Sequence, residues 1–271
     1  MTELHRNRFS IFFLVIFYLL AIYKLSHGLW LFQAQPFYFI NRFDGTTWLL
    51  MQTGLHKSLL SNKAGWIVMD VLFYSFPLIW WLAQNKNKST GVVLAVVWLV
   101  INWCYIQAYA LFPTNSIEAS VGWLLMPFLF CTKKIKSFYF LLHACRYFFL
   151  FFFASAAVWK FRQAGIFNVE QMSGVLLMQH KEYLISTPGD WYSHLILWII
   201  RHPVIGYLLY VAATLLELVF AVGFFTRRYD RWLIGCFALF LIMDLFIMRI
   251  PYFETISLAL PLLFSKYKEP L

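Results

Sequence analysis

The chain has 271 residues, of which 62% are hydrophobic and only 13% are charged, and its mean hydropathy is +0.68. Soluble domains carry about 25% charged and about 45–50% apolar residues, so this composition excludes an ordinary soluble domain and predicts an integral membrane protein. The net charge of +10 calls for no nucleic-acid partner, because basic cytoplasmic loops beside anionic lipid headgroups account for it.

The first apolar run, FSIFFLVIFYLLAIY, follows the basic stretch HRNR, as the apolar core of a signal peptide would. The run is long, however, and no small-residue cleavage site follows it, so we expect a retained first helix. A helix needs about 20 mostly apolar residues to cross the hydrocarbon layer.

Eight stretches of the chain meet or approach that length. They are 9–31, 64–83, 91–112, 117–131, 138–159, 203–225, 232–250 and 252–265. The fourth and eighth are short, so we expect them to be tilted, broken or re-entrant. The predicted fold is an all-α, polytopic helix bundle that forms a single transmembrane domain over residues 1–271.

The short turns between these spans fix the expected orientation. The basic turns NKNK, CTKKIK and TRRYDR all fall on one side, and the charge-poor turn FPTNSIEAS falls on the other. Basic loops stay in the cytoplasm, so both termini are predicted to be cytoplasmic. We expect the host membrane to be the bacterial cytoplasmic membrane.

Two outer segments, 32–63 and 160–202, are too long to be simple turns. The second contains IFNVEQMSGVLLMQHKEYL, the turn STPGDW and then YSHLILWIIRH. Both segments are predicted to form interfacial helices on the outer leaflet. The four cysteines lie in or beside apolar runs without a Cys-x-x-Cys pair, so neither a disulfide framework nor a metal site is predicted.

Ionisable groups at membrane depth are costly, and they usually face the bundle interior and have partners. Arg146 and Glu217 fall at similar depths toward the inner side, so we predict an ion pair between them. Its simplest role is to clamp two helices together.

The outer half of the predicted membrane bundle contains a wider range of ionisable groups. Lys24, Asp70 and Asp244 are predicted at outer-leaflet depth, and His180 and His194 belong to the outer side. One interpretation is an outward-facing polar cavity, with Lys24, Asp70, His180 and His194 as ligand-binding candidates. The other is that longer outer loops simply collect polar residues, and the sequence leaves both open.

Lys160 ends the apolar run in SAAVWKFRQAG and lies 14 residues after Arg146. Fourteen residues make nearly four helical turns and about 21 Å, so the two side chains share approximately one face. A lysine desolvated in a pocket can act as a base near neutral pH. The alternative is snorkelling, in which the amine only reaches the lipid headgroups.

The stretches FFASAAVWKFRQAGIFNVEQMSG and YVAATLLELVFAVGFFTRRYDRWLIG resemble the membrane domain of vitamin K-dependent γ-carboxylases. That domain is also called the horizontally transferred transmembrane domain and is related to DoxX-like membrane proteins. The resemblance covers about 138–264. It implies that Lys160 is the active-site base, which would deprotonate a reduced vitamin K-like molecule on the outer side.

The chain departs from that family at the positions where carboxylases use histidines. SIEASVGW and LFLIMDLF contain none, and Glu118 and Asp244 are the polar groups available there. The large extramembrane domain of the carboxylases has no counterpart among these residues. We therefore do not expect glutamate carboxylation.

Three functions compete at this level. The first is a membrane oxidoreductase, or a partner of one, that binds a quinone or isoprenoid-type ligand in an outward-facing cavity around Lys160. The second is a non-enzymatic membrane subunit or scaffold that docks an extracytoplasmic protein partner through its outer segments. The third, a transporter, ranks last because no inverted repeat is evident.

Overall fold

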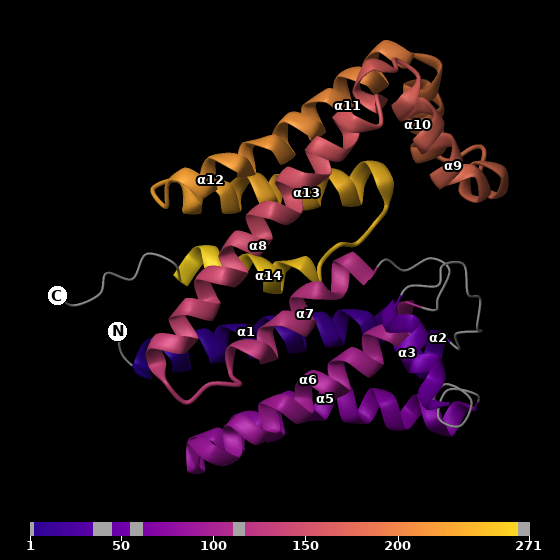
Figure 1. The fold of residues 1–271 in the computed structure, drawn as a ribbon. Coiled ribbons are helices and arrows are strands. Elements are labelled where there is room, and N and C mark those ends of the chain that lie inside the picture. Colours follow the sequence, from indigo (N-terminus) through magenta and orange to yellow (C-terminus); the bar gives the residue numbers. More distant parts are fainter. Residues whose placement is uncertain (1–2, 35–44, 55–61, 111–116, 265–271) are drawn as a thin grey trace. The chain divides into compact units, whose positions relative to one another are not determined.

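The computed structural model describes residues 3–34, 45–54, 62–110 and 117–264, and throughout this part of the chain the regular elements are helices (Figure 1). The all-α prediction is therefore confirmed for the described residues. The chain divides into two compact units, 1–145 with 253–271, and 146–252. The division falls inside one long helix, α8 (Ile135–Arg162), so each unit is described by itself.

Six helical stretches of the described chain are long and apolar enough to cross a membrane. They are Glu3–Ala34, Lys63–Lys86, Lys88–Ala108, Ile135–Arg162, Pro203–Phe225 and Asp230–Met248. Each overlaps one of the eight predicted spans. The other two predicted spans are the short helices α7 (Ile117–Leu129) and α14 (Thr255–Phe264). At 1.5 Å per residue they are about 20 Å and about 15 Å long, less than the thickness of the hydrocarbon layer.

The first unit is built on long helices that meet through aromatic rings. Its further elements are α1 (Glu3–Ser26), α2 (Leu31–Ala34), α3 (Gly45–Thr53), α5 (Lys63–Lys86) and α6 (Lys88–Ala110). Phe17, Phe73 and Trp123 are buried at its centre, and the rings of Phe73 and Tyr105 stack with centroids 3.8 Å apart. Aromatic rings suit this position because each buries a large apolar area.

The two short helices of this unit, α7 and α14, approach each other closely at Gly122. A Cβ at this position would lie 3.0 Å from both the backbone oxygen of Glu254 and the backbone nitrogen of Leu258. Small residues allow helix backbones to pack at such short distances. Gly122 is therefore a packing residue.

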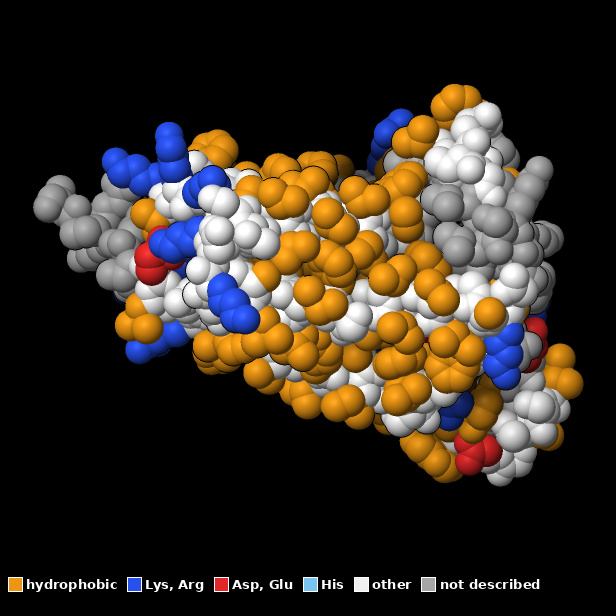
Figure 2. All heavy atoms as spheres, turned by 90° about the horizontal axis from the view of Figure 1, so that it is seen from below, with side chains coloured by type: hydrophobic (Ala, Val, Ile, Leu, Met, Phe, Trp, Pro, Cys, Tyr) orange, Lys and Arg blue, Asp and Glu red, His pale blue; other side chains and the backbone are white. Residues whose placement is uncertain are grey.

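The outer face of the first unit is apolar. Figure 2 shows hydrophobic side chains over the middle of this face, with Lys and Arg side chains toward its two ends. Val71 and Leu82 of α5 and Val93 and Val100 of α6 are each more than half exposed. An exposed apolar surface of this extent fits a lipid environment.

The second unit contains the remaining part of α8 and a compact group of helices after it. These are η1 (Gly165–Phe167), α9 (Gln171–Ser186), α10 (Trp191–Arg201), α11 (Pro203–Leu218), η2 (Val219–Ala221), α12 (Val222–Phe225) and α13 (Asp230–Met248). The predicted turn STPGDW is confirmed, since it joins α9 to α10. Asp190 caps α10 by accepting a hydrogen bond from the backbone N–H of Tyr192.

The segments predicted to be interfacial differ in how much of them the structure describes. In 160–202, α9 and α10 pack together around buried Leu176, Tyr192 and Ile196. In 32–63, α3 is a helix, and the stretches 35–44 and 55–61 lie outside the described residues.

Candidate functional site

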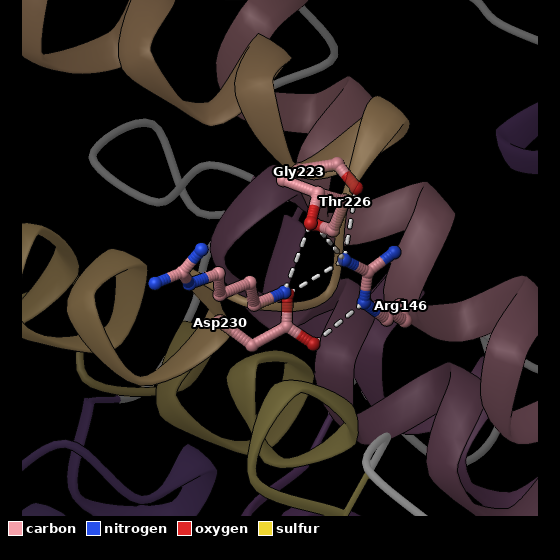
Figure 3. A network of polar contacts seen from close by, with 5 residues as sticks. Arg146, Gly223, Thr226 and Asp230 are labelled. Carbon is pink, nitrogen blue, oxygen red and sulfur yellow. Dashed lines mark hydrogen bonds and ion pairs between the residues drawn. The ribbon is translucent and has the colours of Figure 1, made fainter.

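The guanidinium of Arg146 on α8 is bound at the turn between α12 and α13 (Figure 3). Its Nε and Nη2 atoms donate to the two carboxylate oxygens of Asp230 at 2.9 and 2.6 Å. Nη2 also donates to the backbone oxygens of Gly223 and Thr226. Arg146 and Asp230 are both almost completely buried, and this bidentate pair joins α8 to the first residue of α13.

The predicted pairing of Arg146 with Glu217 is therefore wrong. Arg146 pairs with Asp230, which lies in the predicted cytoplasmic turn TRRYDR. Side chains of a helix lean toward its N-terminus, so the long side chain of Arg146 reaches back toward the start of α8. It meets Asp230 at the start of α13.

Glu217 pairs instead with Lys160. The Lys160 Nζ atom donates to Glu217 Oε1 at 2.8 Å, and the two side chains are 23% and 6% exposed. The ring of Tyr210 lies below the amine, with its centroid 5.3 Å from Nζ. In this structure Lys160 is therefore engaged with an acid on a neighbouring helix.

The direction of the helices explains why depth estimated from residue number did not predict the pairing of Lys160 with Glu217. The helices α8 and α11 are antiparallel, since Phe153 contacts Phe220 whereas the later Lys160 contacts the earlier Glu217. The two side chains therefore lean in opposite directions along the bundle. The two side chains approach each other although their Cα atoms differ in depth.

Asp244 on α13 completes the group. It lies within electrostatic range of both Lys160 and Glu217. One carboxylate oxygen of Asp244 (Oδ2) and one of Glu217 (Oε2) are buried without a hydrogen-bond partner among the described residues. Lys160, Glu217 and Asp244 thus form a cluster of two acids around one base. Two of its carboxylate oxygens accept no hydrogen bond from the described residues.

A repeated spacing brings Asp244 to this place. Asp230 and Asp244 lie 14 residues apart on α13, the same separation as Arg146 and Lys160 on α8. The ring pairs Phe149–Phe237 and Phe153–Phe240 lie between these levels, so the two helices run in parallel. The equal spacing on two parallel helices is consistent with Asp244 lying within electrostatic range of Lys160.

Beside this cluster lies an apolar cavity of about 290 Å³. Residues of α9, α11 and α13 form its wall, including Ala213 and Phe240, and Asp244 is its one ionisable lining residue within the described chain. Lys160 and Glu217 do not line the cavity. A mostly apolar pocket with one convergent polar group is the usual form of a small-molecule site.

The ligand-binding candidates Lys24 and Asp70 belong to the first unit. The Lys24 Nζ atom lies 2.6 Å from Glu254 Oε1 in a buried ion pair that no sequence pattern indicates. Asp70 accepts hydrogen bonds from the backbone N–H groups of Leu31 and Phe32 at 3.1 and 2.9 Å, and from the Tyr105 hydroxyl at 2.8 Å. It thereby caps the first turn of α2, a structural role that requires no ligand.

The histidine candidates occupy different environments in the second unit. His180 on α9 is buried, and its Nε2 atom lies 2.8 Å from the backbone oxygen of Ile247, so Nε2 carries a proton and donates it. His194 on α10 is exposed. The side chain of Glu118, the remaining candidate, lies outside the described residues.

The surroundings of His180 predict a pH-dependent stability. Burial holds the pKa of His180 below its ordinary value of 6.5; the hydrogen bond to Ile247 opposes this effect and the Arg249 guanidinium adds to it. The folded state therefore binds fewer protons than the unfolded state once the pH falls below about 6.5. The contribution of this histidine to stability is complete above that pH and is lost as the pH falls through the lower, folded-state pKa.

Wild-type protein should therefore lose thermal stability between pH 7.5 and pH 5.5, and a His180→Gln variant should lose less. Glutamine retains an N–H donor for Ile247 but takes up no proton in this range. Thermal unfolding at both pH values measures the difference. A His194→Gln variant is the matched control, and a pH response reduced equally in both variants would contradict the prediction.

Comparisons with family models, with curated proteins and with solved structures find no match to this chain.

Proposed function

We propose that this chain is a multi-pass integral membrane protein that binds a hydrophobic small molecule, of quinone or isoprenoid type, in the cavity between α9, α11 and α13. The observation that carries the proposal is the composition of the cavity wall, which is apolar except for Asp244. The apolar body of such a ligand would fill the cavity, and its polar head would point toward Asp244.

The proposal includes the finer features expected from the sequence. These are eight spans in one transmembrane domain, cytoplasmic termini, outer interfacial helices, and a location in the bacterial cytoplasmic membrane. It also includes the resemblance to the membrane domain of the γ-carboxylases. The six long apolar helices support the membrane assignment.

The proposed role of Lys160 in proton transfer depends on its two acidic neighbours, Glu217 and Asp244. Its amine donates to Glu217, so it could accept a proton from a ligand only after passing one of its own protons to that carboxylate. Asp244 lies within electrostatic range of Lys160 and lines the cavity, so it would be the direct contact to the ligand. We therefore assign Asp244 to ligand contact and Lys160 to charge compensation or proton transfer behind it.

The test is extraction of the purified full-length protein followed by mass spectrometry of the bound lipids. We expect one quinone or isoprenoid lipid at near-stoichiometric amounts. An Ala213→Leu variant should lower its occupancy by about tenfold, because the added methyl groups occupy the cavity.

Ala238→Leu is the matched control, since Ala238 is exposed on α13 and does not line the cavity. Recovery of bulk phospholipid alone from wild-type protein would contradict the proposal. Equal losses of ligand in the two leucine variants would contradict the assigned position.

A second candidate function is a membrane subunit that docks an extracytoplasmic protein. It is favoured by the large apolar side chains that project from the segment around α9. Phe167, Met178 and Ile185 are each more than 70% exposed. Crosslinking from this segment in intact membranes would capture a stoichiometric protein partner if this function is correct, and only lipid if it is not.

A further inference from the structure

A second cavity, of about 150 Å³, lies in the first unit where α1 begins, α5 ends and α6 begins. Its wall is polar and charged, unlike that of the apolar cavity in the second unit. The lining residues are Glu3, Arg6, Asn7, Gln84, Asn85, Lys88 and Gly91. This site is separate from the one to which a function was assigned above.

Arg6 is the central group of this cavity. The residue is only 7% exposed, and one side of its guanidinium faces the ring of Phe138, with the ring centroid 5.5 Å away. Within the described chain, no hydrogen bond or ion pair joins its guanidinium to an acceptor, and the attraction of Glu3 acts only at longer range. A buried charge is stable only when it is paired, so this guanidinium calls for an anion.

Two further donors line the same cavity. Gln84 Nε2 is buried and has no acceptor among the described residues. Lys88 Nζ lies 2.8 Å from Glu3 Oε1, but both side chains are largely exposed. Exposed ion pairs of this kind are weak, so an incoming anion can share the lysine. With Glu3 included, the wall carries two bases and one acid.

The position of the cavity adds to its preference for anions. The N-termini of α1 and α6 contribute positive potential here and the C-terminus of α5 contributes negative potential, so the helix dipoles add a net positive contribution. The sequence predicts this end of the helices on the cytoplasmic side, where basic pockets between membrane helices meet anionic headgroups. The guanidinium fork of arginine also matches two oxygens of a phosphate group.

We propose that this cavity binds a phosphate group, carried by an anionic phospholipid headgroup or present as free phosphate. Arg6 makes the main contact through two N–H groups. Gln84 Nε2 donates a hydrogen bond to the same group, and Lys88 closes the site from the solvent side.

The test uses the full-length protein, purified and delipidated in neutral detergent. Dioctanoyl phosphatidic acid and inorganic phosphate are titrated separately, and the dissociation constant is obtained from the thermal stabilisation that each produces. We expect saturable stabilisation that weakens by about tenfold or more in Arg6→Gln, because a charge-assisted, bidentate contact is removed.

Arg8→Gln is the matched control. It removes the same charge from the same helix, but Arg8 is exposed and does not line the cavity, so the dissociation constant should change by less than about twofold. If Arg6→Gln fails to fold, Lys88→Gln is the second test of the site. Lys88 is exposed, so its replacement should not impair folding. It should weaken binding severalfold while leaving the ligand-free melting temperature unchanged.

The two probes distinguish the source of the phosphate group. Tighter binding of phosphatidic acid identifies a lipid headgroup, and equal binding identifies free phosphate. The proposal is overturned if neither probe stabilises the protein. It is also overturned if Arg8→Gln weakens binding as much as Arg6→Gln, or if Lys88→Gln leaves binding unchanged.

Discussion

Replacing Arg146 with methionine is expected to lower the free energy of unfolding by about 3–5 kcal/mol, because buried Asp230 would lose the bidentate ion pair that Arg146 supplies. The backbone oxygens of Gly223 and Thr226 would lose their donor as well. The effect should appear in unfolding by denaturant in mixed micelles, followed by circular dichroism.

A double variant separates two contributions to this loss: the missing ion pair and the cost of leaving one buried charge behind. Arg146→Met combined with Asp230→Leu should recover most of the loss, since apolar residues of similar volume can replace a buried ion pair. Glu3→Gln breaks the exposed pair with Lys88 and is the control, with an expected change below about 1 kcal/mol. A single Arg146→Met variant as stable as this control would show that the buried pair is not needed for folding.

Replacing Lys160 with methionine should have the second-largest effect, because one base serves two acids. The change leaves Glu217 and Asp244 near each other with no cation beside them. We expect a loss of about 2–4 kcal/mol, below that for Arg146 because the lysine side chain is 23% exposed.

Glu217→Gln should cost clearly less than Lys160→Met. In that variant Lys160 still has Asp244 within electrostatic range, whereas in Lys160→Met neither acid has a cation. Lys181→Met, at an exposed position on α9, is the matched control and should leave the unfolding curve unchanged. Equal losses in Glu217→Gln and Lys160→Met would show that Asp244 takes no part in the cluster.

The spacing of charges was visible in the sequence, but the pairing was not. Arg146 and Lys160 were recognised as one face of a helix because 14 residues make nearly four turns. The same separation between Asp230 and Asp244 on α13 was missed, since Asp230 was placed in a cytoplasmic turn. A search for matching intervals on two helices would have found this signal.

The buried contacts of the first unit also could not be predicted from the sequence, because their partners are far apart in the chain or are backbone groups. Lys24 and Glu254 are separated by most of the chain, and Glu254 precedes a helix too short to be recognised as a straight span. Asp70 looked like a ligand-binding group because its donors are backbone N–H groups of α2, which no side-chain pattern reveals.

Composition and apolar run length by themselves determined that the described part of the chain is helical and where its six long apolar helices lie. These properties depend on each segment alone, because a helix in lipid must satisfy its own backbone and be long enough to cross. The tertiary structure alone decided which acid meets Lys160, that Asp244 faces a cavity, and that Arg6 is buried beside another. Those outcomes depend on the offset between helices and on the direction in which their side chains lean, and neither is encoded in a single segment.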